Sequence, residues 1–84
     1  MNITFKLYAS LQELLPAGAV KNAVSIEVAD DASLHDIIDQ YRVPRKLAHL
    51  VLINGVFYCE ADRDSREVLK ENDVLAIWPP VAGG

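Results

Sequence analysis

The chain has 84 residues, a net charge of −4 at pH 7, and 51% hydrophobic residues. This length allows one small domain that buries about 60 to 65% of the surface of the unfolded chain, and the hydrophobic fraction argues against disorder. The negative charge argues against nucleic acid as a partner, because the sequence contains no basic stripe that displaces counterions from phosphates.

The first third of the chain predicts two strands separated by a short helical turn. Residues 2–8 alternate apolar and polar side chains, as in a strand that is buried on one face. Residues 9–15 place leucines at helical spacing behind Ser10, a candidate N-cap, so a short helical turn is expected before Pro16. Alternation returns at residues 23–28, which predicts a second strand antiparallel to the first.

The middle of the chain predicts one helix. Residues 34–41 repeat apolar side chains at i, i+3, i+4 and i+7, the stripe of an amphipathic helix. The helix should end near Arg42 or Val43, because Pro44 disfavours helical backbone at the residue before it. His35 lies off the apolar stripe, so we expect an exposed helix residue rather than a ligand or a base.

Three further strands are expected after the helix. Residues 49–53 and 56–60 flank Asn54-Gly55, a pair that provides the two positive-φ positions of a tight hairpin turn. Asn72-Asp73 forms the turn before the last strand, residues 74–78. The order ββαβββ on one small sheet predicts an α+β fold in which the sheet curls around the helix.

The strands at residues 49–53 and 74–78 are apolar at both parities. One face of each strand packs on the helix, but no remaining element covers the other face. Scattered exposed apolar side chains are one explanation, since they are normal on any protein surface. We favour a docking patch for a partner protein, with Phe57 or Trp78 among its anchors.

The residues after the last strand can neither extend a sheet nor start a helix. We therefore divide the chain into a domain at residues 1–78 and an extended tail at residues 79–84. The first two tail residues, Pro79 and Pro80, lack backbone donors and stop the strand. The side chains then shrink to none, through Val81, Ala82, Gly83 and Gly84. Such a tail fits a narrow active site, but its carboxylate must be activated, for instance as a mixed anhydride with AMP, before any group is attached.

The sequence gives little support for a membrane segment, a metal site or a catalytic cysteine. No apolar run approaches the roughly 20 residues of a membrane helix, and the first residues lack the features of a signal peptide, so we expect a cytoplasmic protein with no membrane partner. The single Cys59 and the scattered His35 and His49 do not make a metal-ligand set. Cys59 is expected within a strand and without a role in sulfur transfer.

The motifs resemble a known family along the whole chain. They are the opening FKLYASL at residues 5–11, the turn Ile53-Asn54-Gly55, and the end DVLAIWPPVAGG at residues 73–84. These residues resemble the ubiquitin-like β-grasp sulfur carriers, and within them the small subunit of molybdopterin synthase. The family usually has Phe before the Pro-Pro pair and Gly-Asp before the last strand, where this chain has Trp78 and Asn72-Asp73.

The resemblance implies a carrier cycle. An adenylating enzyme related to ubiquitin-activating enzymes would use ATP and Mg²⁺ to convert the Gly84 carboxylate to an acyl-adenylate, and a persulfide sulfur would displace AMP to leave a thiocarboxylate. A larger synthase subunit would accept the tail, residues 79–83, and pass sulfur to a pterin precursor to form the dithiolene. The chain itself would bind no cofactor and would act as a co-substrate rather than as an enzyme.

Three alternatives stay open on the sequence. The thiazole sulfur carrier of thiamine synthesis shares the fold and the terminal chemistry that the resemblance implies, although its tails generally lack the pair Pro79-Pro80. A ubiquitin-like modifier would join Gly84 to a target lysine through an isopeptide bond. A plain β-grasp binding module would make no use of its terminal glycines.

Overall fold

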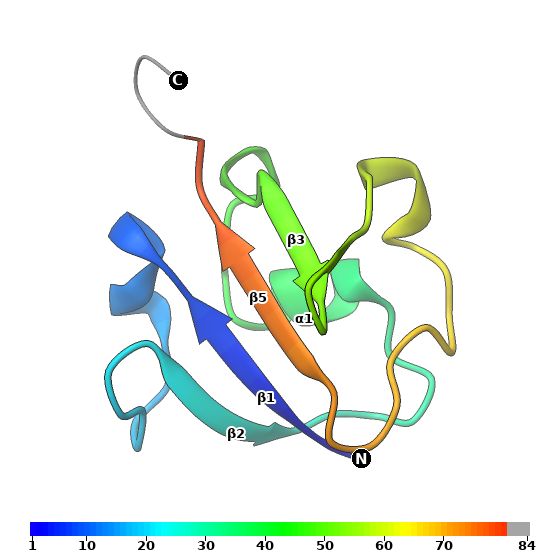
Figure 1. Cartoon of the computed structure of the whole chain (residues 1–84), viewed down its shortest axis with the longest axis horizontal. Helices are drawn as coiled ribbons and strands as arrows, with labels where there is room; N and C mark the ends of the chain where they lie inside the picture. The colour runs from blue at the N-terminus through cyan, green and yellow to red at the C-terminus, as the bar shows by residue number, and fades with distance from the viewer. Residues whose placement is uncertain (81–84) are drawn as a thin grey trace.

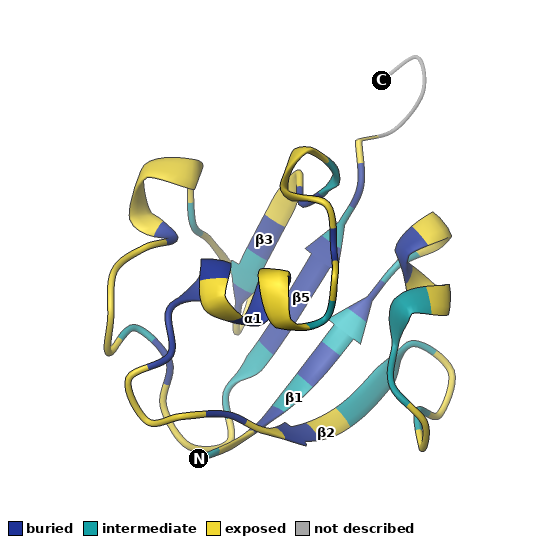
Figure 2. Ribbon diagram, turned by 180° about the vertical axis from the view of Figure 1, so that it is seen from behind, coloured by how far each residue is buried: buried dark blue, intermediate teal, exposed yellow. Residues whose placement is uncertain are grey.

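The computed structural model describes residues 1–80. The five strands are β1 (Asn2–Leu7), β2 (Ala23–Glu27), β3 (Leu50–Ile53), β4 (Val56–Phe57) and β5 (Val74–Trp78). The helix is α1 (Leu34–Gln40), and three short 3-10 turns are η1 (Ala9–Leu14), η2 (Arg45–Leu47) and η3 (Glu60–Asp62). The strands form one sheet, and α1 lies across one of its faces (Figures 1 and 2).

The sheet has the strand order β2-β1-β5-β3-β4, so β5 is its central strand. β1 pairs with β5 in parallel, whereas β1 with β2, β3 with β5, and β3 with β4 are antiparallel. A parallel pair needs a long connection over one face of the sheet, and α1 lies within that connection. The predicted mixed ββαβββ sheet packed on one helix is therefore confirmed.

The core lies between α1 and the inner face of the sheet. The alternation in β1 buries Ile3, Phe5 and Leu7, as the sequence predicted. The other fully buried large side chains come from η1, α1, β3 and β5: Leu11, Leu34, Ile37, Ile38, Val51, Leu75 and Ile77. Each such side chain stabilises the fold by about 1.5 to 3 kcal/mol relative to an exposed position, so this layer holds the sheet and the helix together.

The turns follow the predicted chemistry. Asn54 and Gly55 have φ values of 51° and 85°, and Asn72 has a φ of 70°, so the hairpin and the turn before β5 use left-handed backbone that Asn and Gly tolerate. The Asn54 amide also donates to Asp73 Oδ1 and accepts from the N–H of Val74, each at 2.9 Å. Asn54 therefore joins the β3–β4 hairpin to the start of β5.

The first helical turn differs from its prediction. η1 is a 3-10 turn that begins at Ala9, and its N-cap is Tyr8, which makes no side-chain capping bond, so Ser10 is not the cap. The Tyr8 N–H donates instead to the carbonyl of Ile77 at 3.1 Å. This bond keeps Tyr8 beside β5, so the chain leaves the sheet only at the next residue. Ala9 begins η1 there with a left-handed φ of 53°.

The return strand of the hairpin is shorter than predicted. β4 ends at Phe57, not at residue 60, and Cys59 lies outside the sheet as the N-cap of η3. The side chain of Arg63 accounts for this difference, because its Nε donates to the carbonyl of Tyr58 at 3.0 Å. The first carbonyl after β4, that of Tyr58, thus accepts from the Arg63 side chain rather than from a neighbouring strand.

The prediction that His35 is exposed is wrong. Its side chain is 5% exposed, and its Nδ1 lies 2.8 Å from Asp64 Oδ1. The backbone N–H of His35 donates to the carbonyl of Arg63 at 3.0 Å. The segment after η3 therefore folds back over the first turn of α1, a contact between distant parts of the chain that helical periodicity does not reveal.

The N-terminus of α1 gives a first testable prediction. Ser33 Oγ accepts from the N–H of Asp36 at 3.0 Å, and the Asp36 carboxylate accepts from the N–H of Ser33 at 3.1 Å, which together form a capping box. Replacing Ser33 with Ala should lower the free energy of unfolding by about 1 kcal/mol. Urea unfolding at pH 7 measures this loss, and an unchanged midpoint would contradict it.

The same cap should have a pH signature. The hydrogen bond from the Ser33 backbone, with a further contribution from Arg66, holds the pKa of the Asp36 carboxyl below its ordinary value of 3.8. A carboxylate with a lowered pKa in the folded state stabilises above the unfolded-state pKa, and that stabilisation is lost as the pH falls through the folded-state pKa. The stability difference between the native chain and Asp36→Asn should therefore be complete at neutral pH and shrink below about pH 4.

Candidate functional site

The face of the sheet opposite α1 carries a group of neighbouring apolar side chains, called the outer patch below. In the strand register, Leu52 pairs with both Phe57 and Ala76, and Leu50 pairs with Trp78. Residues that lie directly opposite each other on neighbouring strands share a face of the sheet. The outer patch therefore consists of five residues on three strands: Leu50, Leu52, Phe57, Ala76 and Trp78.

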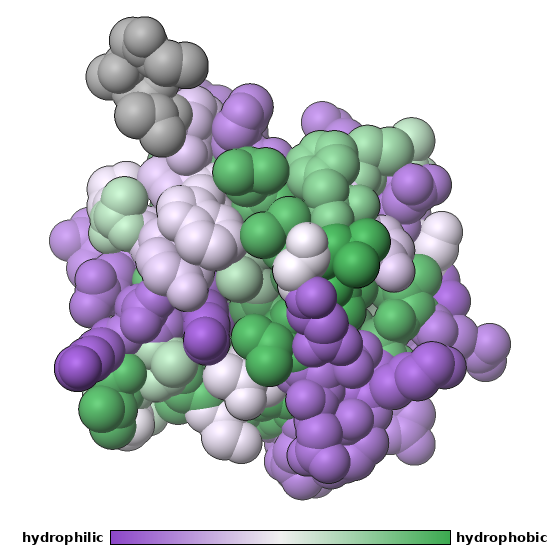
Figure 3. Space-filling model, in the orientation of Figure 1, coloured by the Kyte–Doolittle hydropathy of each residue, from purple (hydrophilic) through white to green (hydrophobic). Residues whose placement is uncertain are grey.

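Part of the outer patch is open to solvent. Phe57 is 52% and Leu50 is 41% exposed, Leu52 and Trp78 are half-buried, and Ala76 is buried. Hydrophobic side chains gather over β3 and the neighbouring part of β5, with hydrophilic ones on both sides (Figure 3). An exposed aromatic ring within an apolar group is the usual anchor of a protein interface, so this face is a candidate docking surface.

Trp78 is the last residue of β5 and directly precedes the tail. Its ring stacks on Tyr8, with ring centroids 3.9 Å apart and planes 4° apart. Its carbonyl accepts from the N–H of His49 at 3.1 Å. Trp78 is therefore held by the end of β1 on one side and by the segment before β3 on the other, which fixes the end of β5.

The predicted tail begins directly after this point. Pro79 is buried and Pro80 is exposed, and neither has an N–H that extends the ladder. The tail residues Val81, Ala82, Gly83 and Gly84 lie outside the described residues. The structure thus places Trp78 and Leu50 of the outer patch at the end of β5 where the tail begins, and Phe57 further back along the sheet, opposite Leu52. The role of Gly84 stays a prediction.

The remaining sequence candidates do not assemble into a reactive centre. Cys59 is exposed, and its thiol donates to Asp62 Oδ2 at 3.3 Å. His49 is also exposed, and its backbone bonds to Trp78 and Arg63. Across residues 1–80, no group of three or more His, Cys, Asp or Glu side chains is arranged to hold a metal ion. No helix in the same span is long and apolar enough to cross a membrane.

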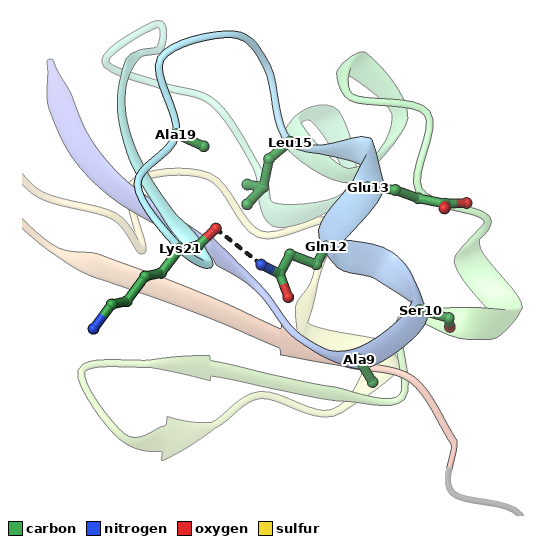
Figure 4. A pocket seen from close by; sticks show the side chains of 7 residues that line it. All are labelled: Ala9, Ser10, Gln12, Glu13, Leu15, Ala19 and Lys21. Carbon is green, nitrogen blue, oxygen red and sulfur yellow. Dashed lines mark hydrogen bonds between the residues drawn. The ribbon is translucent and has the colours of Figure 1, made fainter.

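An open hollow of about 450 Å³ lies between η1 and the loop that follows it. Gln12 crosses it and donates to the carbonyl of Lys21 at 3.0 Å (Figure 4). None of its lining side chains is buried, and ligand sites generally bury most of their ligand among apolar walls with a few fixed polar groups. We therefore assign this hollow no binding role.

Comparison with known proteins identifies the family. The model of the ThiS family matches residues 5–84, which is almost the whole chain. The chain belongs to the ThiS family. The resemblance to ubiquitin-like sulfur carriers, predicted from the motifs, is thereby confirmed, and so is the ubiquitin-like β-grasp fold. A search of curated protein sequences finds no match.

Solved structures agree with this ThiS-family assignment. The small archaeal modifier protein 1 (SAMP1) of Haloferax volcanii is 26% identical over the whole of both chains, with a TM-score of 0.65. A second Haloferax volcanii protein, solved in solution, is 25% identical over all of this chain and 87% of that one, with a TM-score of 0.73. A Pyrococcus furiosus protein assigned as subunit 1 of molybdopterin converting factor is 22% identical over 95% of this chain and 98% of that one, with a TM-score of 0.64.

Sequence reasoning missed part of the candidate site of this ThiS-family chain. It predicted an apolar patch on the strands at residues 49–53 and 74–78 with Phe57 or Trp78 among its anchors, but it did not name Leu50, Leu52 and Ala76 as members. The apolar residues at both parities were the signal for these three. Tyr8 gave no such signal, because its stacking on Trp78 depends on the parallel pairing of β1 with β5.

Proposed function

We propose that the chain is a sulfur carrier whose Gly84 carboxylate is adenylated and converted to a thiocarboxylate, which donates sulfur for the dithiolene of molybdopterin. One observation carries the proposal. The central strand β5 ends at Trp78, which belongs to the outer patch, and the sequence continues there as Pro-Pro-Val-Ala-Gly-Gly. A docking surface that adjoins the start of a narrow terminal tail suits a protein that presents its terminus to a partner enzyme.

The chemistry follows from the state of the carboxylate. At neutral pH it is ionised and unreactive toward nucleophiles, so it first attacks the α-phosphorus of ATP and releases pyrophosphate. A persulfide sulfur then attacks the acyl carbon, and AMP leaves with the electron pair of the broken C–O bond. Cleavage of the resulting acyl disulfide by a second thiol leaves the thiocarboxylate on Gly84.

The proposal gives the side chains of this protein no acid or base role. The chain is a co-substrate in the cytoplasm, and ATP and Mg²⁺ belong to the adenylating enzyme. That enzyme and a larger synthase subunit are the proposed partners, each docking on the outer patch and receiving the residues from Pro79 to Gly83. Glycine suits the end of such a tail, because a side chain would crowd the channel and hinder attack at the carbonyl.

Intact mass measurement tests the proposal. The chain is incubated with the adenylating enzyme of its own organism, ATP, Mg²⁺ and a persulfide donor. The expected product has one oxygen replaced by sulfur at the C-terminus. Loaded chain is then mixed with the large synthase subunit and either a pterin precursor or the thiazole-forming enzyme and its substrate. Sulfur transfer to the pterin alone supports the proposal, whereas transfer to the thiazole alone would assign the chain to thiamine synthesis.

A protein modifier is the second candidate. The likeness that favours it is the 26% identity to small archaeal modifier protein 1 over whole chains. In this case the activated Gly84 forms an isopeptide bond with a target lysine. Tagged chain purified from its own cells under denaturing conditions distinguishes the two functions, because a modifier is recovered as higher-mass conjugates that a thiol reductant does not release.

Replacing Cys59 with Ser tests whether the sulfur resides only at the terminus. The thiol is exposed, and it donates to the Asp62 carboxylate on the surface. We expect a change in the free energy of unfolding below about 0.5 kcal/mol and a native rate of sulfur loading. A folded Cys59→Ser protein that no longer gains sulfur would instead identify the side-chain thiol as the carrier.

A further inference from the structure

Arg63, at the end of η3, is a buried cation that the outer patch and the tail do not explain. It is 4% exposed. Its guanidinium donates to three backbone carbonyls: from Nε to Tyr58 at 3.0 Å, from Nη1 to Ala48 at 2.7 Å, and from Nη2 to His49 at 3.2 Å. No carboxylate in residues 1–80 forms a salt bridge with it. Burying a charge is costly, and an apolar side chain is often the more stabilising choice at such a position.

The three carbonyls lie on the two segments that flank the hairpin. Ala48 and His49 connect η2 to β3, and Tyr58 follows β4. Arg63 thereby ties the entry of β3 to the exit of β4. The backbone of Arg63 is itself held against α1, because its carbonyl accepts from the N–H of His35 and the next residue, Asp64, bonds to the His35 ring.

The His49 peptide connects this guanidinium to the start of the tail. The carbonyl of His49 accepts from Arg63, and the N–H of His49 donates to the carbonyl of Trp78 at 3.1 Å. Trp78 is the last residue of β5, and the following Pro79 has no N–H with which to continue the ladder. The bond from His49 is therefore the last backbone bond that this side of the sheet makes to β5 before the tail.

We infer that Arg63 is a positioning residue, which fixes the direction in which the tail leaves the sheet relative to the outer patch. This inference rests on the proposed function, because it assumes that Gly84 must reach an active site while the outer patch is docked. A partner that binds the patch defines the position of β5, and the His49–Trp78 bond then defines where the tail starts. An error of 1 Å in the placement of reacting groups costs up to about a hundredfold in rate.

Two substitutions test the inference. Arg63→Gln removes the charge and the three-way donor, and Arg63→Lys keeps the charge but loses the planar arrangement of donors. The measurements are the single-turnover rate of Gly84 adenylation at saturating adenylating enzyme, the affinity for that enzyme, and amide hydrogen exchange. Arg66→Gln is the matched control, because Arg66 lies in the same loop, is exposed, and bonds to Asp31 and Asp36 near α1 rather than near the tail.

We expect folded Arg63 variants to adenylate about tenfold more slowly at saturation, with an affinity within twofold of the native chain. The His49 amide should lose more protection than the amides of β1, which a general loss of stability would not produce. Arg66→Gln should change neither the saturated adenylation rate nor the protection of the His49 amide.

The inference is overturned by a native saturated rate in the folded variants, or by a fall in affinity alone. It is also overturned by uniform loss of amide protection, or by failure of both variants to fold, since Arg63 would then serve stability only. Failure of the native chain to be adenylated would refute the proposed function itself. The Arg63 variants are compared with the native chain, so their results bear only on the role of Arg63.

Discussion

A chain without Gly84 should never acquire a thiocarboxylate, although it should fold like the native protein. Removing the residue withdraws the terminal carboxylate by about 3.5 Å, and a displacement of 1 Å already costs up to about a hundredfold in rate. The free energy of unfolding should change by no more than about 0.5 kcal/mol, because the residue follows the last strand and the Pro-Pro break. Intact mass after incubation with the adenylating enzyme, ATP and a sulfur donor measures the loading.

A tail of unchanged length provides the control for the deletion. Ala82→Gly keeps every residue of the backbone and adds no side chain, so it should load at close to the native rate. Urea unfolding of all three proteins checks that the domain is intact. Sulfur transfer from the chain that lacks Gly84, or loading of neither the native chain nor the control, would refute the carrier mechanism.

Replacing Phe57 with Ala should weaken binding of the adenylating enzyme or the synthase subunit by about 2 kcal/mol, which is about thirtyfold in Kd. The ring is 52% exposed on β4 at one edge of the sheet. Because it buries little surface within the domain, the free energy of unfolding should change by less than about 1 kcal/mol. Calorimetric titration and urea unfolding separate these two effects.

Val20 supplies a matched control for Phe57. It is 74% exposed and lies just before β2, at the opposite edge of the sheet from β4. Val20→Ala should therefore leave the affinity unchanged. If Phe57→Ala binds as tightly as the native chain, or if Val20→Ala weakens binding equally, the outer patch is not the docking surface.

Trp78 should respond differently from Phe57, although both lie in the outer patch. Its ring is half-buried and stacked on Tyr8, and such aromatic pairs contribute about 0.5 to 1.5 kcal/mol beyond the area that they bury. Trp78→Ala should thus lose stability as well as affinity. The sequence suggested either aromatic residue as an anchor, and the structure separates an exposed one from one that also holds the end of β5.

The elements of this fold that depend on neighbouring residues were predictable from the sequence. Alternation in residues 2–8 identified β1 and its buried face, and a helical repeat identified α1. Asn54-Gly55 identified the hairpin turn, because positive φ values restrict the choice of residue. In each case the determining interaction lies within a few positions along the chain. The tail chemistry stays a prediction from the order of residues 79–84.

Tertiary structure alone decided the features that join distant segments. Helical spacing placed His35 outside the apolar stripe, yet a loop near Asp64 covers it, because burial depends on what packs over a residue and not on its period. Alternation extended β4 to residue 60, yet the Arg63 side chain takes the carbonyl of Tyr58 and ends the strand. The stacking of Tyr8 on Trp78 required β5 to lie between β1 and β3. Pairing order and side-chain bonds to distant carbonyls leave no periodic pattern in the sequence, so the contacts that hold the start of the tail became visible only in the folded chain.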